Sequence, residues 1–329
     1  MNTSRNLSFD IAKGIGILLV VIGHTMSPIM DGNLVMEKCY QILYVFHMPL
    51  FFLLSGLVSS RMIDNSSMNL KSKTELLKQR AIRLMIPYVF WAIIYTIMKP
   101  LMKEQVRFQY SYSPWTILIG NNPAGQLWFL YVLFILSIVV IFCVKKQHLR
   151  WWTILALIIS IIAPIIPSKY NLPGISLSFS LYQVGFFFLG VYLISHRDSF
   201  FKDGRLASVG LIVFITYSIL SLLGHDVWPI KTIAGFGACY GILYLSSKVA
   251  QLSIGKKLAW LGRNSMDIYI LHAPILVVGR TLLKKLSLSE PWVYVAALSL
   301  CAIILSLLIS SLIVKKVKIL KLLVLGIKS

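Results

Sequence analysis

Charged residues are scarce in this chain of 329 residues. They make up 13% of the sequence, whereas a soluble domain contains about 25%. Hydrophobic residues make up 57%, and the mean hydropathy is +0.80. Acidic residues are the rarest charged type, with 11 Asp and Glu against 32 Lys and Arg. This composition excludes an ordinary soluble fold and predicts an all-α, polytopic membrane protein.

Several familiar sequence signals are also missing. The four cysteines are too few and too scattered for a disulfide framework. The metal-binding spacings H-E-x-x-H and C-x-x-C do not occur, and neither do the nucleotide-binding patterns G-x-G-x-x-G and G-x-x-x-x-G-K. The net charge of +21 comes from basic residues that separate apolar stretches, which is typical of topology signals. We therefore expect no bound metal ion and no nucleic-acid partner.

Apolar stretches of about 17 to 23 residues indicate about ten transmembrane helices: 11–30, 41–60, 84–102, 126–144, 151–167, 179–196, 206–224, 232–247, 264–283 and 292–314. One set of alternating loops and the two termini hold 22 Lys and Arg, and the other loops hold nine. The positive-inside rule then places both termini in the cytoplasm. The outer segment 280–291 fits this rule least well, because it holds three basic residues. We expect residues 1–329 to form one membrane domain in a bacterial-type plasma membrane, with no appended soluble domain.

The first apolar stretch contains Lys13 and His24, eleven positions apart. Eleven helical steps return His24 to within about 20° of Lys13, roughly 16 Å further along the axis. Ionisable groups inside a membrane segment are costly and are candidates for function. This arrangement suits a long anionic molecule lying along the helix, with Lys13 at the cytoplasmic end. The alternative is a lysine that reaches the membrane surface while paired with Asp10, three residues earlier.

A second histidine, His47, lies about six residues inside the second predicted span. The short 31–40 connection makes the first two spans antiparallel neighbours, so His24 and His47 could share a site. We name both as catalytic candidates. The alternative is a structural pair that forms hydrogen bonds between helices.

Basic side chains also lie at the predicted cytoplasmic ends of later spans. Arg80 and Arg83 precede the third span, and Arg263 precedes the ninth. Guanidinium groups around a cytoplasmic opening suit bidentate recognition of phosphate. The positive-inside rule alone would also place arginines at these positions.

Two further groups of residues are candidates for support or substrate binding. Asp267, Tyr269 and His272 lie within two helical turns in the ninth span and form either a structural polar cluster or part of the catalytic site. Trp128 opens the fourth span and belongs either to an interfacial aromatic belt or to a wall on which a sugar stacks.

Taken in order, these segments resemble the membrane-bound acyltransferase family 3, which includes bacterial polysaccharide and Nod-factor O-acetyltransferases. The resembling pieces are Phe9-Asp10-x-x-Lys13-Gly14-Ile15 followed by His24, Phe46-His47-Met48-Pro49-Leu50-Phe51-Phe52 with Ser55-Gly56, Arg80-x-x-Arg83-x-x-x-Pro87-Tyr88, Leu127-Trp128-Phe129-Leu130, and Ser265-Met266-x-Ile268-Tyr269-Ile270-Leu271-His272-x-Pro274. The family often has Arg at the position of Lys13. The lysine and the Phe-His-Met-Pro string look closest to the fucose 4-O-acetylase-like subgroup.

The resemblance implies transfer of an acetyl group across the membrane. Acetyl-CoA would approach from the cytoplasm, with its phosphates held by Lys13, Arg80, Arg83 and Arg263. His24 would act as general base on a hydroxyl of an extracytoplasmic glycan or lipid-linked sugar, and the alternative is that His24 accepts the acetyl group itself. Membrane lipid is the other expected partner, and the oligomeric state is left open.

A secondary transporter or lipid-glycan flippase is the alternative. In that reading the histidines inside the membrane and Asp267 would relay protons. The sequence shows neither an inverted repeat nor a matched pair of broken spans, which are the usual pointers to such folds.

Overall fold

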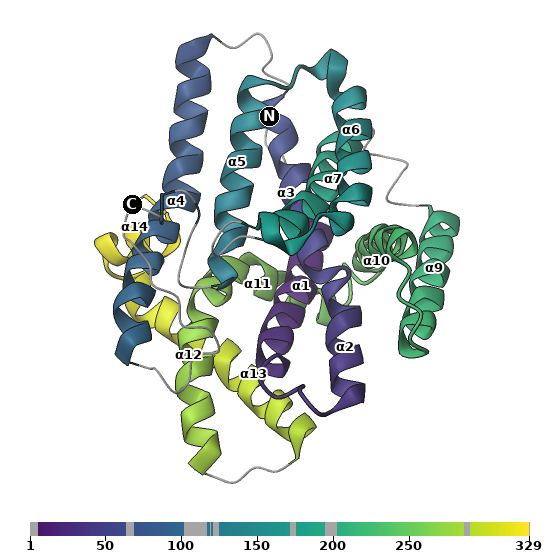
Figure 1. The fold of residues 1–329 in the computed structure, drawn as a ribbon. Coiled ribbons are helices and arrows are strands. Elements are labelled where there is room, and N and C mark those ends of the chain that lie inside the picture. The colour runs from purple at the N-terminus through teal and green to yellow at the C-terminus, as the bar shows by residue number, and fades with distance from the viewer. Residues whose placement is uncertain are drawn as a thin grey trace. The chain divides into compact units, whose positions relative to one another are not determined.

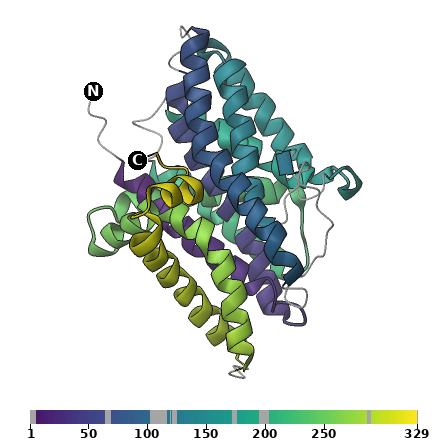
Figure 2. The ribbon, with the colours of Figure 1, turned by 90° about the vertical axis from the view of Figure 1, so that its left-hand side faces the viewer.

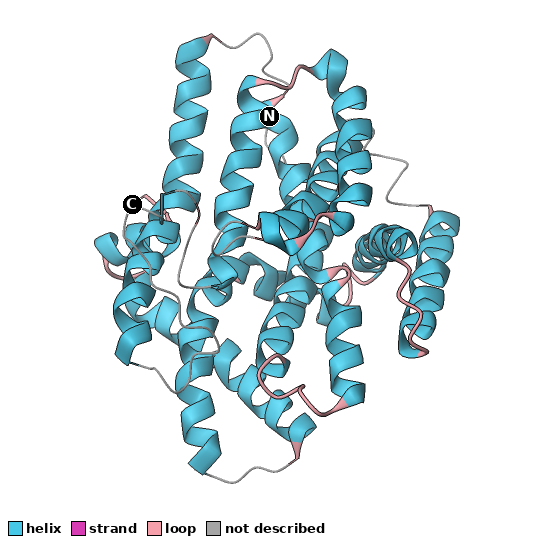
Figure 3. Ribbon diagram, viewed as in Figure 1, coloured by secondary structure: helices cyan, strands magenta, loops and turns pink. Residues whose placement is uncertain are grey.

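Every regular element in the part of the chain that the structure describes is a helix (Figure 3). This computed structural model describes residues 6–63, 69–101, 117–118, 120, 125–171, 176–194, 203–285 and 290–328. Within them, eight helices are long and apolar enough to cross a membrane. The predicted fold class, an all-α polytopic membrane protein, is confirmed.

Each of the ten predicted apolar stretches contains a helix among the residues that the structure describes. Eight coincide with the membrane-length segments, and the other two form α10 (Trp228–Lys248) and α12 (Ser265–Lys285), each of 21 residues. These two helices are not among the eight membrane-length segments, and α12 carries Asp267, His272 and Arg280 in addition to apolar residues. The cytoplasmic location of the termini stays a prediction.

The chain divides by its internal contacts into two units, Met1–Leu54 with Leu193–Leu307, and Ser55–Tyr192 with Leu308–Ser329. The expectation of a single membrane domain stays a prediction, and each unit is described by itself. The helices of the first unit are α1 (Leu7–Met26), α2 (Leu34–Tyr44), the start of α3 (His47–Ser59), α9 (Gly204–Leu222), α10, α11 (Ser253–Arg263), α12 and most of α13 (Pro291–Ile309).

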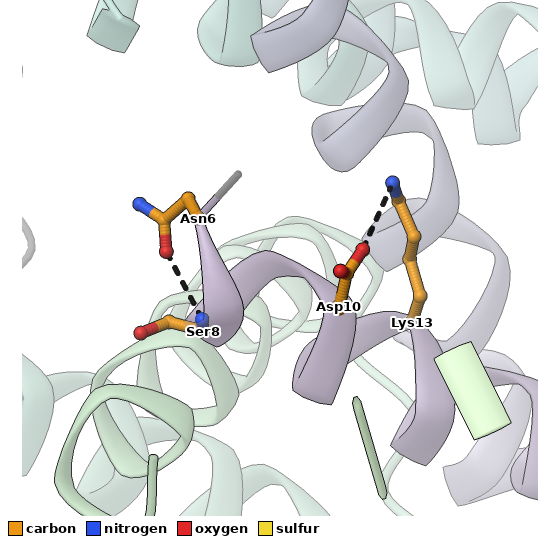
Figure 4. A network of polar contacts seen from close by, with 4 residues as sticks. All are labelled: Asn6, Ser8, Asp10 and Lys13. Carbon is orange, nitrogen blue, oxygen red and sulfur yellow. Dashed lines mark hydrogen bonds and ion pairs between the residues drawn. The ribbon is translucent and has the colours of Figure 1, made fainter. Parts of the chain in front are cut away.

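Helix α1 is the centre of the first unit, because α2, α10, α11 and α12 all pack against it. It begins at an Asn6 cap, whose side-chain oxygen accepts a hydrogen bond from the Ser8 N–H at 3.0 Å (Figure 4). Elsewhere in this unit α9 lies beside α10, and α12 lies beside α13, where Leu298 packs over Gly279 (Figure 1).

The α1–α11 contact is a backbone-to-backbone packing made possible by two glycines. A Cβ atom on Gly14 would lie 2.1 Å from the Leu258 carbonyl oxygen, and one on Gly262 would lie 1.8 Å from the Asp10 carbonyl oxygen. Small residues allow helices to approach this closely. The segment 248–263, expected as a loop, therefore contains a helix that packs against the start of α1.

The predicted 41–60 helix is interrupted between α2 and α3. Pro49 cannot donate a hydrogen bond to the Val45 carbonyl, and its ring crowds that group. The α2 helix ends at Tyr44, and α3 begins at His47, where a proline in the first turn is tolerated. Leu34–Ser59 is one of the eight membrane-length segments, but the helix within it is not continuous, and the break places His47 at a helix start.

The second unit contains the rest of α3, α4 (Leu70–Leu101), α5 (Trp128–Phe142), α6 (Leu149–Ile162), most of α7 (Leu177–Ile194) and α14 (Lys318–Leu325), with short 3-10 turns and a π-helical turn at Ser310–Val314. Helix α4 packs against α5 and α14 (Figure 2). Helices α6 and α7 meet where the ring of Trp152 stacks on that of Phe188, with ring centroids 6.0 Å apart.

Candidate active site

Lys13 lies on α1 one turn after Asp10, as the sequence predicted (Figure 4). Its Nζ atom lies 3.9 Å from Oδ1 of Asp10. The lysine side chain is 28% exposed and the aspartate side chain 4%. The distance exceeds that of a tight charge-assisted hydrogen bond, which is about 2.8 Å. Lys13 therefore lies beside Asp10 and keeps part of its side chain exposed.

Helix α11 brings further cations to the same end of α1. Gly262 touches the Asp10 carbonyl, so the backbone of Arg263 lies beside the first turns of α1, and its side chain is exposed. The outer face of α11 forms an open groove lined in part by Lys256, Lys257 and Trp260. Helix α11, which packs against α1, thus carries three basic residues, Lys256, Lys257 and Arg263.

Arg80 and Arg83 belong to α4 in the second unit and are both half-buried. Arg83 donates a hydrogen bond from Nη1 to the Leu325 carbonyl at 2.6 Å, at the end of α14. Arg83 therefore has a structural contact that the sequence did not predict. The grouping of these arginines with Lys13 around one phosphate site stays a prediction.

Trp128 is also in the second unit, where it begins α5. Its ring lies 4.9 Å from that of Phe179 on α7. Two residues earlier, Gln126 donates from Nε2 to the Tyr95 hydroxyl at 2.9 Å. An aromatic ring beside amide and hydroxyl groups is a surface that can bind a sugar. A membrane-interface role fits the same residue.

His24 lies in the last turn of α1 and is partly exposed. The imidazole of His272 on α12 lies beside it, with ring centroids 5.2 Å apart and planes inclined by 48°. His272 itself is fully buried. The structure thus brings together two histidines that are 248 positions apart in the sequence, and only His24 of this pair is open to a substrate.

His272 has a defined hydrogen-bonding state. Its Nδ1 atom lies 2.9 Å from the Ile268 carbonyl oxygen, which can only accept, so Nδ1 carries the hydrogen. Its Nε2 atom is buried without a hydrogen-bond partner. The ring centroid of Tyr269 lies 6.4 Å from that of His272. Asp267 is buried in the first turn of α12. The predicted cluster therefore lies on a helix in contact with α1.

His47 occupies the break between α2 and α3. Its Nδ1 donates to the Leu43 carbonyl at 2.9 Å, and its ring packs edge-on against Tyr44 at 4.3 Å. The residue is 1% exposed. These contacts fit a structural role at the helix break, and a direct catalytic role for His47 stays a prediction.

Arg280 is a site residue that the sequence analysis did not single out. Its Nη2 donates to the His24 carbonyl oxygen at 2.8 Å. That carbonyl lies at the C-terminal end of α1, where the helix dipole favours a positive charge. The sequence carried one sign of this role, because segment 280–291, which contains Arg280, fits the positive-inside rule poorly. Arg280 instead bonds to the end of α1.

The His, Cys, Asp and Glu side chains of the described segments form no group of three that could hold a metal ion. The donor atoms around His24 are instead imidazole nitrogens, a guanidinium group and nearby hydroxyls. Ser299 on α13, for example, donates to Thr25 Oγ1 at 3.1 Å. These groups suit proton transfer and hydrogen bonding.

Comparison with known proteins agrees with a membrane transferase. The family model described as an acyltransferase domain, acyltransferase 3, matches residues 6–311. The chain therefore belongs to the acyltransferase 3 family.

Two curated relatives carry the name nodulation protein NolL. The protein from Mesorhizobium japonicum is 33% identical over 191 residues, covering 56% of this chain and 48% of its own length. The protein from Sinorhizobium fredii is 29% identical over 191 residues, with 56% and 49% coverage. The chain thus spans about half the length of the curated relatives that it matches. No solved structure matches this chain.

Proposed function

We propose that this protein transfers an acetyl group from cytoplasmic acetyl-CoA to a hydroxyl of an extracytoplasmic glycan or lipid-linked sugar. The observation that carries the proposal is the placement of two partly exposed side chains, those of His24 and Lys13, on the same helix. Their axial separation of roughly 16 Å suits the pantetheine arm that joins the nucleotide of CoA to its thioester. Membership of the acyltransferase 3 family supports the same chemistry.

The residues present suit the nucleotide and the pantetheine arm of acetyl-CoA. Lys13 and Arg263, with Arg80 and Arg83 as further candidates, would bind the phosphates through charge-assisted hydrogen bonds. Trp260, which is 50% exposed in the α11 groove, offers a ring on which an adenine can stack. The apolar stretch of α1 between Lys13 and His24 would lie along the pantetheine arm.

In this mechanism His24 acts as general base. The ring nitrogen of His24 that carries no hydrogen takes the proton of the acceptor hydroxyl, while the hydroxyl oxygen attacks the thioester carbonyl carbon. The carbon–sulfur bond then breaks, and His24 returns the proton to the leaving thiolate. General-base positioning typically contributes about 10²–10⁴-fold in rate.

Purified protein provides the first test. We expect slow release of CoA from acetyl-CoA by the wild type, a loss of about 10²-fold or more in His24→Ala, and no change in His148→Ala, which replaces an exposed histidine. CoA affinity should stay within a few-fold in His24→Ala. Absence of thioester hydrolysis in every protein, together with transport of a glycan lipid, would favour the flippase alternative.

A second test separates direct transfer from an acyl-enzyme. A general base requires acceptor and donor together, whereas a nucleophilic histidine would be acetylated by acetyl-CoA alone. We expect no stoichiometric label on protein incubated with radiolabelled acetyl-CoA in the absence of sugar. Label retained at neutral pH on the wild type and absent from His24→Ala would refute direct transfer. Mass spectrometry of surface glycans from deletion and complemented cells would identify the acceptor.

A further inference from the structure

A general base works only when one of its ring nitrogens is free of hydrogen and faces the hydroxyl. An imidazole in a helix can hold its hydrogen on either nitrogen, and a hydrogen-bond partner on the far side decides which. Asp10 cannot be that partner, since fourteen residues of helix, about 21 Å, separate it from His24. The helices packed against α1 could therefore supply a side chain that orients His24.

Helix α12 supplies an imidazole with the required properties. His272 donates through Nδ1 to the Ile268 carbonyl, which leaves Nε2 as an acceptor. This Nε2 atom is buried and has no hydrogen-bond partner. Buried acceptors are nearly always satisfied, so an unpaired one beside a candidate catalytic ring indicates an interaction that a slight ring rotation would complete.

One donor close to this ring is His24. Its ring centroid lies 5.2 Å from that of His272, a separation at which rotation of the His24 ring brings a nitrogen of one ring within hydrogen-bond distance of a nitrogen of the other. Arg280 restrains the His24 backbone through its carbonyl. The backbone from which the His24 ring projects is therefore held in place beside His272.

We propose that His272 is a positioning residue for the transfer reaction. Its Nε2 accepts the N–H of His24, which fixes His24 in the tautomer whose other nitrogen is bare and faces the acceptor hydroxyl. His272 stays neutral and exchanges no proton during the reaction. As His24 takes the hydroxyl proton, the hydrogen bond to His272 strengthens and stabilises the imidazolium form. This inference rests on the proposed function.

Substitutions at His272 test the role of the acceptor. His272→Gln retains an oxygen that can accept from His24, and His272→Leu removes it at similar volume. We expect kcat to fall at least tenfold in His272→Leu and to recover in part in His272→Gln, while KM for acetyl-CoA stays within twofold in both. Thermal melting of each purified variant shows whether the fold is kept. Equal kcat values for the wild type and a folded His272→Leu would overturn the inference.

A measurement on the unmodified sequence covers the case in which His272→Leu does not fold. Nitrogen-15 spectra of protein labelled at its six histidines, assigned with His24→Gln and His272→Gln, report the tautomer of each ring. We expect His272 to carry hydrogen on Nδ1 and His24 to populate a single neutral tautomer. A mixture of both tautomers at His24 would overturn the inference.

The roles of His24 and of His272 can be refuted separately. If His24→Ala keeps wild-type thioester hydrolysis and glycan acetylation, the assignment of His24 as base is wrong, and the positioning role is refuted with it. If His24→Ala is inactive and a folded His272→Leu has wild-type kcat, the proposed function stands and only the role of His272 is refuted.

Discussion

Removal of the Lys13 ammonium should weaken acetyl-CoA binding without changing the chemistry at His24. Lys13 Nζ lies 3.9 Å from Asp10 Oδ1, and its side chain is 28% exposed, so part of the side chain is accessible to a ligand. A hydrogen bond to a charged group contributes about 1.5–3 kcal/mol, which corresponds to roughly a 10- to 150-fold change in Kd. We expect an increase in this range for Lys13→Ala.

Isothermal titration of CoA into detergent-solubilised protein measures the effect. Lys13→Arg keeps the charge and adds a bidentate donor, so its affinity should equal or exceed that of the wild type. Asp10→Ala is the matched control for the ion pair, because it removes the neighbouring carboxylate and keeps the ammonium. Wild-type CoA affinity in Lys13→Ala, measured on folded protein, would refute the placement of the donor phosphates at this end of α1.

Three other predictions concern the scaffold and the topology. Gly262→Ala should lower the free energy of unfolding by about 1–3 kcal/mol and weaken CoA binding, because its Cβ would lie 1.8 Å from the Asp10 carbonyl oxygen. In the control Gly125→Ala the added Cβ meets open space, so this variant should melt like the wild type. Equal melting temperatures of the two variants would contradict the packing. Arg280→Ala should reduce kcat more than CoA affinity, because Arg280 holds the His24 carbonyl; enzyme kinetics together with CoA titration would check this, and a loss confined to CoA affinity would oppose it. A cysteine at Ser72 in a cysteine-free background should resist an impermeant maleimide on intact cells, and one at Asp31 should react; the reverse pattern would invert the donor and acceptor sides.

The local part of the structure was predictable because membrane helices are encoded by continuous apolar stretches. The eleven-residue spacing of Lys13 and His24 fixed their relation along α1 before any tertiary contact was known. The sequence also contains the cause of the α2–α3 break, which is Pro49. A hydropathy average does not detect such a break, because this proline lies in a largely apolar stretch. Helix α11 was missed for the opposite reason, since its 11 residues are too few and too basic to register as a span.

The long-range part of the site was not predictable from spacing. His272 contacts His24 across 248 positions, and no periodicity within one helix indicates which other helix will face it. The same limit applies to Arg280, which the positive-inside rule counts as a loop charge although it bonds to α1. A basic residue that fits a topology rule poorly is therefore evidence for an inward-facing role.

The proposed chemistry is divided between two helices, α1 and α12. Helix α1 carries the charge that would bind the donor and the imidazole that would take the proton, so its own sequence sets the distance between the two steps. Helix α12 carries the acceptor that would set the tautomer and the guanidinium that holds the end of α1. A displacement of α12 would alter the state of His24 without moving Lys13. Substitutions in the α12–α13 contact, such as Gly279 beneath Leu298, should therefore change kcat and leave CoA affinity intact.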